Sequence, residues 1–282
     1  MSWPRRIICS SFCRWLPAAA ALLAGAAWGA GDWPRLADGR PDLNGVWQAL
    51  NTANYDIRPH DARAALMLVD GPAGPVPAPQ LAPLGAVGAV PAGPGVVAGG
   101  EIPYQGWAFE RQQENQRDWI NRDPEIRCFL PGVPRAHYMP YPFQIVQGSG
   151  SLYFAYEYAG AVRNVHLVDP GPPPRPSWMG QSVAHWEDDT LVIVVSGFNG
   201  RTWLDRAGNF HSDALIVTER FTPTSAYTLE YQATLEDVKV YTRPWTMRMT
   251  LYRRVGDDAR IHPLKCAAFV EELIYGHLRQ EP

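Results

Sequence analysis

The sequence predicts an all-β protein, with a closed antiparallel up-and-down barrel as the first choice and a two-sheet sandwich as the alternative. Two observations lead to this class. About eight short segments alternate between apolar and polar residues, and turn-forming residues separate them every 8 to 12 positions or so. The barrel is preferred because closure leaves no strand edge exposed. One or two short helices are expected beside the strands.

The clearest strands lie in the middle of the chain. Residues 181–187 alternate, which places His185 and Glu187 on one face. Residues 190–196 read TLVIVVS and are apolar on both faces, as in a strand buried on both sides. Two Asp residues at 188–189 favour a tight turn because their short side chains bond their own backbone. We therefore expect a hairpin here.

The next strand carries a carboxylate on its apolar face. Within residues 214–221, Glu219 shares a face with Leu215, Val217 and Phe221. A buried carboxylate without a partner is costly. We therefore expect Glu219 to meet an Arg or a His inside the protein.

Other segments complete the expected fold. The remaining predicted strands are residues 143–146, 151–158, 161–168, 227–236 and 245–255. A polar helix is predicted over 104–122, and the tail over 266–278 contains a short helix-like run. Together with the central strands, these segments supply enough antiparallel neighbours for a barrel.

The first 30 residues have the features of a cleaved signal peptide. Arg5, Arg6 and Arg14 precede a short Ala-rich apolar run, and small residues follow it. The run is too short for an integral membrane span. Arg5-Arg6 also allows a twin-arginine signal. We therefore expect a periplasmic or secreted protein.

Removal of this leader takes the net charge from −3 to −6, because the leader contains three Arg and no acidic residue. An acidic chain of this kind is a poor partner for nucleic acid, whose phosphates need a basic surface. The expected partner is a small-molecule ligand, and the oligomeric state stays open.

The mature chain divides into three parts by composition. Residues 31–70 form an N-terminal segment with the first strand, and residues 101–282 form the main β domain. Between them, residues 71–100 are rich in Pro, Gly and Ala and contain no charged residue, a composition that predicts a linker loop without a packed core element.

Two cysteines remain after the leader is removed, Cys128 and Cys266. In an oxidising compartment two cysteines so far apart are natural disulfide partners. The alternative is a pair of buried free thiols.

Long stretches resemble a widespread group of secreted bacterial proteins. The stretches are CFLPGVPR at 128–135, YPFQIV at 141–146, and SVAHWEDDTLV with GFNGRTWLDRAGNFHSDALIVTERF within 182–221. The resemblance covers roughly residues 124–252 and implies export, without implying an activity. This sequence departs from the group at two places: Gln181 stands where the group is expected to have Asp, and Glu187-Asp188 stands where the group is expected to have Glu-Gly.

A shorter motif resembles the start of lipocalin-type barrels. Gly45-Val-Trp47 stands at the beginning of the first expected strand. In such barrels the Trp plugs one end and an Arg from the last strand packs across it. Arg248 and Arg253 are the candidates for that Arg here.

The residues that could carry chemistry gather around a long connection over residues 197–213. Loops of about 17 residues are uncommon in compact domains and are often functional. An acid/base site would use His185, His211, Glu187, Asp205 and Tyr141. Substrate contacts would come from Arg135, Trp203, Asn199 and Glu219. No standard nucleophile, phosphate-loop, dinucleotide or zinc-helix motif is present.

Three functional hypotheses follow. The first is a barrel or groove that binds a small molecule without chemistry. The second is a cofactor-independent lyase, isomerase or hydrolase that uses His185 and His211. The third is a divalent metal site formed by His185, Glu187, His211 and Asp213, which offer nitrogen and oxygen ligands. No other cofactor is expected.

A purely structural role for the same residues stands beside these hypotheses. The stretch TWLDRAGNFHSD can be a loop tied down by Asp and His bonds to backbone amides. On balance the sequence favours an exported small-molecule-binding protein.

Overall fold

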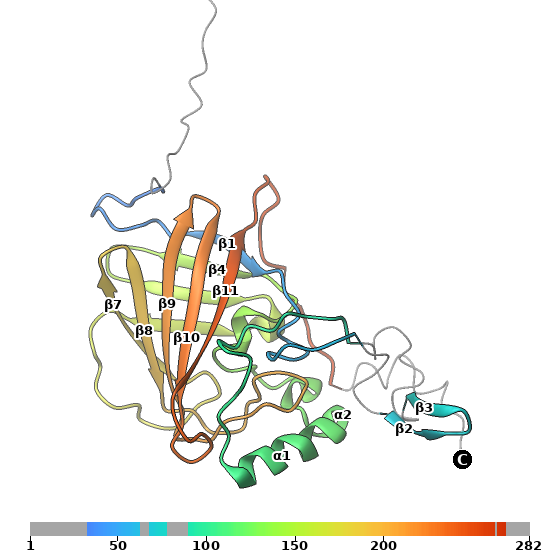
Figure 1. The fold of residues 1–282 in the computed structure, drawn as a ribbon. Helices are drawn as coiled ribbons and strands as arrows, with labels where there is room; N and C mark the ends of the chain where they lie inside the picture. Colours follow the sequence, from blue (N-terminus) through green and yellow to red (C-terminus); the bar gives the residue numbers. More distant parts are fainter. Residues whose placement is uncertain (1–32, 63–67, 78–89, 263, 269–282) are drawn as a thin grey trace, which may run out of the picture.

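The structure, a computed structural model, describes residues 33–62, 68–77, 90–262 and 264–268. In this part of the chain nine strands close into a mixed barrel in the order β1-β11-β10-β9-β8-β7-β6-β5-β4, which confirms the predicted all-β barrel (Figure 1). The barrel strands are β1 (Gly45–Ala49), β4 (Phe143–Gln147), β5 (Leu152–Tyr156), β6 (Val162–His166), β7 (Gln181–Glu187), β8 (Thr190–Ser196), β9 (Ile216–Ser225), β10 (Thr228–Glu236) and β11 (Trp245–Arg253).

The barrel departs from a purely antiparallel one at a single seam among these strands. β6 and β7 run parallel and share two register pairs, Val165 with Ser182 and His166 with Val183. An odd number of strands explains this, because alternating directions can close only an even ring. Residues 167–180 connect β6 to β7 and must return along the barrel from one end to the other. We call this Pro-rich connection the strap.

At the start of the barrel, the expected contact between the first Trp and a late Arg is present. Trp47 on β1 is buried, and its indole N–H donates to the Leu43 carbonyl oxygen at 2.9 Å. The guanidinium of Arg253, at the end of β11, lies 4.7 Å from the centre of the Trp47 ring. Of the two candidates, Arg253 therefore packs across the Trp, while Arg248 points outward and is exposed.

Helices cover the other end of the barrel. α1 (Gly106–Arg117) and α2 (Trp119–Arg122) lie at the lower end in Figure 1 and replace the one continuous helix predicted over 104–122. α1 packs against the long connection between β8 and β9. There Gln112 donates to the Ala207 carbonyl oxygen, and a Cβ on Gly208 would come within 2.6 Å of the Asn115 side chain.

Among the described residues, three short 3-10 helices follow α2. They are η2 (Pro124–Arg127), η3 (Arg135–His137) and η4 (Tyr158–Gly160). The side chain of His137, at the end of η3, is surrounded by rings from the barrel strands β4, β5, β9 and β10. The segment of η3 therefore reaches into the barrel interior as a plug.

The predicted linker differs from its expectation at both described ends. β2 (Leu68–Gly71) and β3 (Gly74–Pro77) pair as a separate hairpin. Val90 and Val97 are buried, and the backbone of Val97 forms an isolated antiparallel β-bridge with Met247 on β11. Two apolar side chains in a Pro- and Gly-rich stretch are therefore enough to anchor it to the core. Residues 78–89 lie outside the described residues, as do the predicted leader and most of the predicted tail helix.

The predicted disulfide is present, since Cys128 and Cys266 are bonded. No helix within the described ranges is long and apolar enough to cross a membrane.

Candidate functional site

The barrel interior contains a buried polar cluster around Glu219. This carboxylate is fully buried and accepts hydrogen bonds from His137 Nε2 at 2.9 Å and from the Tyr231 hydroxyl at 2.8 Å. Its second oxygen accepts from Arg163 Nη2, and Arg163 Nε donates to the Ser182 hydroxyl at 2.7 Å. The expectation that Glu219 finds an Arg or His partner inside the protein is confirmed.

Electrostatics fix the charge states in this cluster. Burial alone would raise the pKa of Glu219, but Arg163 and the hydrogen bond from His137 outweigh it and lower that pKa to about 2. Burial lowers the pKa of His137, so its imidazole is neutral. Because Glu219 is a carboxylate, the His137 proton lies on Nε2, and Nδ1 is left as a buried acceptor without a partner.

Aromatic side chains fill the space around this cluster. The rings of Phe143, Phe154, Tyr156, Phe221 and Tyr231 lie with their centres 4.9 to 5.6 Å from the His137 ring. All five are buried. The interior is therefore a packed core that holds the plug in place, and it encloses Glu219 completely.

Two of the hollows that are open to solvent lie on the outside of the barrel, beneath the strap. The first has a volume of about 290 Å³ and is bounded by β6, the strap and the first residue of β7. Its polar lining residues include Asn164, His166, Arg175 and Gln181. Arg163 also borders it, but its guanidinium points inward to Glu219. We call this hollow the first strap pocket.

A second hollow adjoins the first across the strap. It has a volume of about 390 Å³ and lies over the outer face of β7 and β8, bordered by Val183, Val194 and His185. Pro173 and Gln181 line both hollows. We call it the second strap pocket, and the shared residues make the two pockets neighbours.

The strap is held at several points, so the pockets are preformed. Gln181 donates from Nε2 to the Gly171 carbonyl oxygen at 2.7 Å. The backbone of Ser177 bonds to Gly197 and Asn199 at 2.9 Å each. Trp178 stacks on Phe129 with ring centres 4.6 Å apart. These contacts come from three different parts of the chain and fix the strap as a bridge over the seam.

His185 and Glu187 point outward rather than into the barrel. Their side chains are 57% and 48% exposed and meet each other at 3.1 Å, and Arg220 also bonds Glu187 at 2.8 Å. The hydrogen bonds from Arg220 and then His185 lower the pKa of Glu187. Only His185, of the predicted catalytic residues, borders a strap pocket.

His211 lies elsewhere and is occupied. It is buried, its Nδ1 donates to the Ser212 carbonyl oxygen at 2.8 Å, and its Nε2 accepts from the Thr202 hydroxyl. Because a carbonyl oxygen can only accept, the proton lies on Nδ1. Burial lowers the pKa of His211. The imidazole thus serves as a bonded part of the loop.

The predicted metal set is not assembled. Asp213 pairs with Lys239 at 2.7 Å on the surface, whereas His211 is buried and His185 lies on the outer wall. Nowhere in the described ranges do three or more His, Cys, Asp or Glu side chains form a group that could hold a metal ion. The alternation of residues 181–187 gave the shared face of His185 and Glu187 correctly, but that face is the outer one.

The loop over 197–213 is tied down as the structural hypothesis describes. Asp205 is buried and accepts from the Ile57 amide at 2.8 Å and from the Asn209 side chain at 2.6 Å. Burial, and next the nearby Asp56, raise the pKa of Asp205 to about 7. Trp203 is buried and bridges to Phe210. Asp205 therefore organises the loop from within it.

The other predicted site residues, Arg135 and Asn199 for substrate contact and Tyr141 for catalysis, have partners within the protein. Arg135 is buried and makes two bonds of 2.9 Å to Asp123 and one of 3.0 Å to Asn54. Asn199 accepts from the Arg201 amide at 3.0 Å. Tyr141 stacks on Tyr158, with ring centres 5.9 Å apart. These positions were predicted from residue type alone, which does not report on the partners of a side chain.

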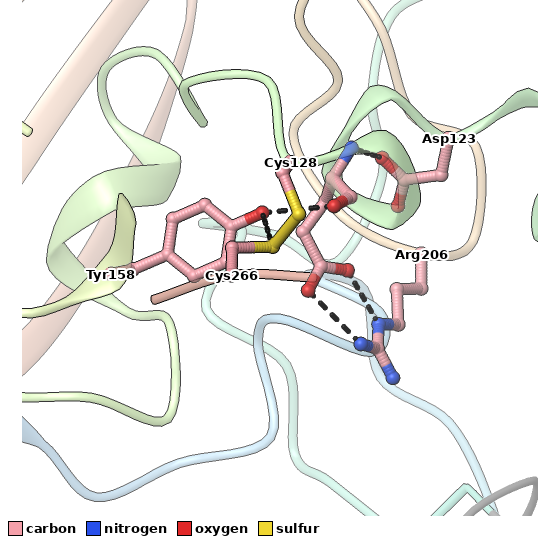
Figure 2. The surroundings of a disulfide bond; sticks show 6 residues. Asp123, Cys128, Tyr158, Arg206 and Cys266 are labelled. Atoms are coloured by element: carbon pink, nitrogen blue, oxygen red, sulfur yellow. Dashed lines mark hydrogen bonds and ion pairs between the residues drawn. A yellow bond between two sulfur atoms is a disulfide. The ribbon is translucent and has the colours of Figure 1, made fainter. Parts of the chain in front are cut away.

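The disulfide lies beside a buried network of ion pairs that includes Arg135 and Asp123. The Tyr158 ring lies beside the bond between Cys128 and Cys266, with Asp123 and Arg206 on the other side (Figure 2). The Tyr158 hydroxyl donates to the backbone oxygen of Glu125 at 2.8 Å, and Arg206 bonds the Glu125 carboxylate at 2.9 Å. The tail residue Cys266 is thus fastened to the segment that carries the plug.

The site residues expected from the sequence do not include His137 in the interior, nor Asn164, His166 and Arg175 around the first strap pocket. Alternation places Asn164 and His166 on the face of β6 opposite Arg163, which is a usable signal. The sequence does not show that β6 and β7 pair in parallel, and this pairing brings the strap back over the same face.

Comparison with known proteins adds no relative: no protein-family model, no curated protein and no solved structure matches the chain.

Proposed function

We propose that the protein is an exported binding protein that holds a small molecule beneath the strap. The observation that carries this is the pair of adjoining pockets of about 290 and 390 Å³, which share Pro173 and Gln181 as lining residues. Ligand sites of small molecules usually occupy a few hundred Å³ and are largely preformed. The packed barrel interior, by contrast, is already filled by the plug and the aromatic rings.

Export is part of the proposal. The leader expected over residues 1–30 and the resemblance to secreted bacterial proteins support it. The disulfide between Cys128 and Cys266 is compatible with an oxidising compartment.

The test is a ligand screen by thermal shift on the mature protein with a variant that fills the first strap pocket. Asn164 is an exposed β6 residue that borders this pocket, so Asn164→Trp should occupy it without disturbing the core. Thr250→Trp is the matched control, because Thr250 is also exposed on a barrel strand and borders neither strap pocket.

We expect compounds that raise the melting temperature of the wild type and of Thr250→Trp but not of Asn164→Trp. Hits that stabilise Asn164→Trp as strongly as the wild type would place the ligand elsewhere and contradict the proposal.

A further inference from the structure

The polar side chains of the first strap pocket lack partners within the described chain, unlike Glu219 and Arg163 in the barrel interior. Among the residues that the structure describes, the side chains of Asn164, His166 and Arg175 make no hydrogen bond or ion pair. Asn164 and Arg175 are exposed and His166 is half-buried. All three can donate hydrogen bonds, and Arg175 is permanently charged.

The charge of this pocket is of one sign. None of its lining residues is an Asp or a Glu. Arg163 is neutralised by Glu219 behind the wall, so its charge is not free. Arg175 is then the charge that a ligand meets, and no carboxylate along the lining competes for it. A planar guanidinium is suited to bidentate contact with a carboxylate or phosphate.

The second strap pocket has a different character. Val183, Val194 and the prolines at 172 and 173 supply apolar surface, and Asp169 is its one acidic lining residue. A ligand that reaches from the first pocket into the second would therefore place its charge near Arg175 and an apolar body against the valines.

From these observations we propose that the ligand is a small organic acid. Its anionic oxygen group binds Arg175, Asn164 and His166 in the first strap pocket, and its apolar body extends past Pro173 and Gln181 over β7 and β8. The inference rests on the proposed binding function and names the ligand class for the same site. Inorganic phosphate shares the anionic chemistry but has no apolar body.

Isothermal titration calorimetry of the mature, disulfide-bonded protein tests this with matched acid and amide pairs. The probes are acetate and acetamide, benzoate and benzamide, and 4-phenylbutyrate and its amide, with inorganic phosphate as a further anion. We expect the acids to bind more tightly than their amides, and affinity to rise from acetate to 4-phenylbutyrate. Added salt should weaken the acids selectively because Arg175 is exposed.

The variant that isolates the charge is Arg175→Gln, and Arg248→Gln is its control, since Arg248 is exposed on the outer face of β11 and borders neither pocket. Loss of a charge-assisted hydrogen bond should weaken benzoate about tenfold in Arg175→Gln. Benzamide in Arg175→Gln, and both probes in Arg248→Gln, should bind as in the wild type.

The outcomes distinguish the ligand class from the binding function itself. Equal binding of acids and amides that is lost in Asn164→Trp would overturn the organic-acid inference and leave the binding function standing. Phosphate binding as tight as 4-phenylbutyrate would overturn the apolar half of the inference. If no probe binds, the organic-acid inference is overturned. If the probes still bind to Asn164→Trp, both the organic-acid inference and the site beneath the strap are overturned.

Discussion

The barrel interior and the first strap pocket contain similar polar side chains, yet they differ in whether those side chains have partners. Inside, Glu219, His137 and Arg163 bind one another and are buried. Outside, Asn164, His166 and Arg175 border a hollow and have no side-chain partner in the described chain. The difference teaches that polar side chains point to a ligand site only where they border a hollow and have no hydrogen-bond partner within the protein.

The two regions also touch each other. Arg163 on β6 points inward to Glu219, whereas its neighbours Asn164 and Val162 border the first strap pocket from the outer face. One short strand thus carries a structural residue on one face and the proposed binding residues on the other. Variants on each face should therefore separate stability from binding.

The largest expected effect is on the interior face. Glu219→Gln leaves the Arg163 guanidinium buried without its counter-charge, which should reduce the free energy of unfolding by about 3 to 5 kcal/mol. Denaturant unfolding at pH 7 measures it. Glu230→Gln is the control, because Glu230 is exposed on β10, and it should unfold like the wild type. A loss below about 1 kcal/mol in Glu219→Gln would show that the cluster is not structural.

Next in size is the disulfide. The sequence separation of Cys128 and Cys266 is 138 residues, and removing such a crosslink typically costs about 2 to 4 kcal/mol. The double variant Cys128→Ser, Cys266→Ser should melt at a lower temperature than the wild type. Binding beneath the strap should persist, since neither cysteine borders a strap pocket. Unchanged melting would mean that the tail is held by other contacts.

A pH titration sharpens the assignment of Glu219. Its pKa falls from 4.5 to about 2 on folding, so its contribution to stability is present above pH 4.5 and is lost as the pH falls through 2. The gap in unfolding free energy between the wild type and Glu219→Gln should therefore shrink by on the order of 3 kcal/mol between pH 4.5 and 2. A gap that stays constant over this window would contradict a carboxylate at this site.

Much of the wall of the barrel was predictable from local pattern. The hairpin of β7 and β8 begins and ends at the predicted residues, and Glu219 has its expected partners. Periodicity sets which residues share a face, but it does not say which face points inward when both carry apolar residues. His185 was therefore predicted beside His211 and instead lies on the outer wall.

The strap was not predictable for a related reason. Alternation is the same in parallel and antiparallel strands, so the direction of β7 relative to β6 leaves no mark on the sequence. The parallel pairing follows from closing nine strands, which is a property of the whole barrel. The candidate site therefore depends on topology rather than on a local motif.

The smallest expected effect on stability is that of Arg175→Gln. Arg175 is exposed and has no partner in the described ranges, so its free energy of unfolding should stay within about 0.5 kcal/mol of the wild type. Denaturant unfolding of both proteins checks this. A large loss would mean that Arg175 holds the strap in place, and its effect on binding would then need another explanation.

The central claim is that the ligand binds beneath the strap, beside Asn164, His166 and Arg175, and NMR titration with benzoate tests it most directly. The mature protein is labelled with nitrogen-15, and the backbone amide shifts are followed. We predict shifts that cluster at residues 162–166, 175 and 177–183, with amides of β9 and β10 unmoved. Shifts centred on residues 137, 219 and 231, with the strap unmoved, would place the ligand in the barrel interior and contradict this account.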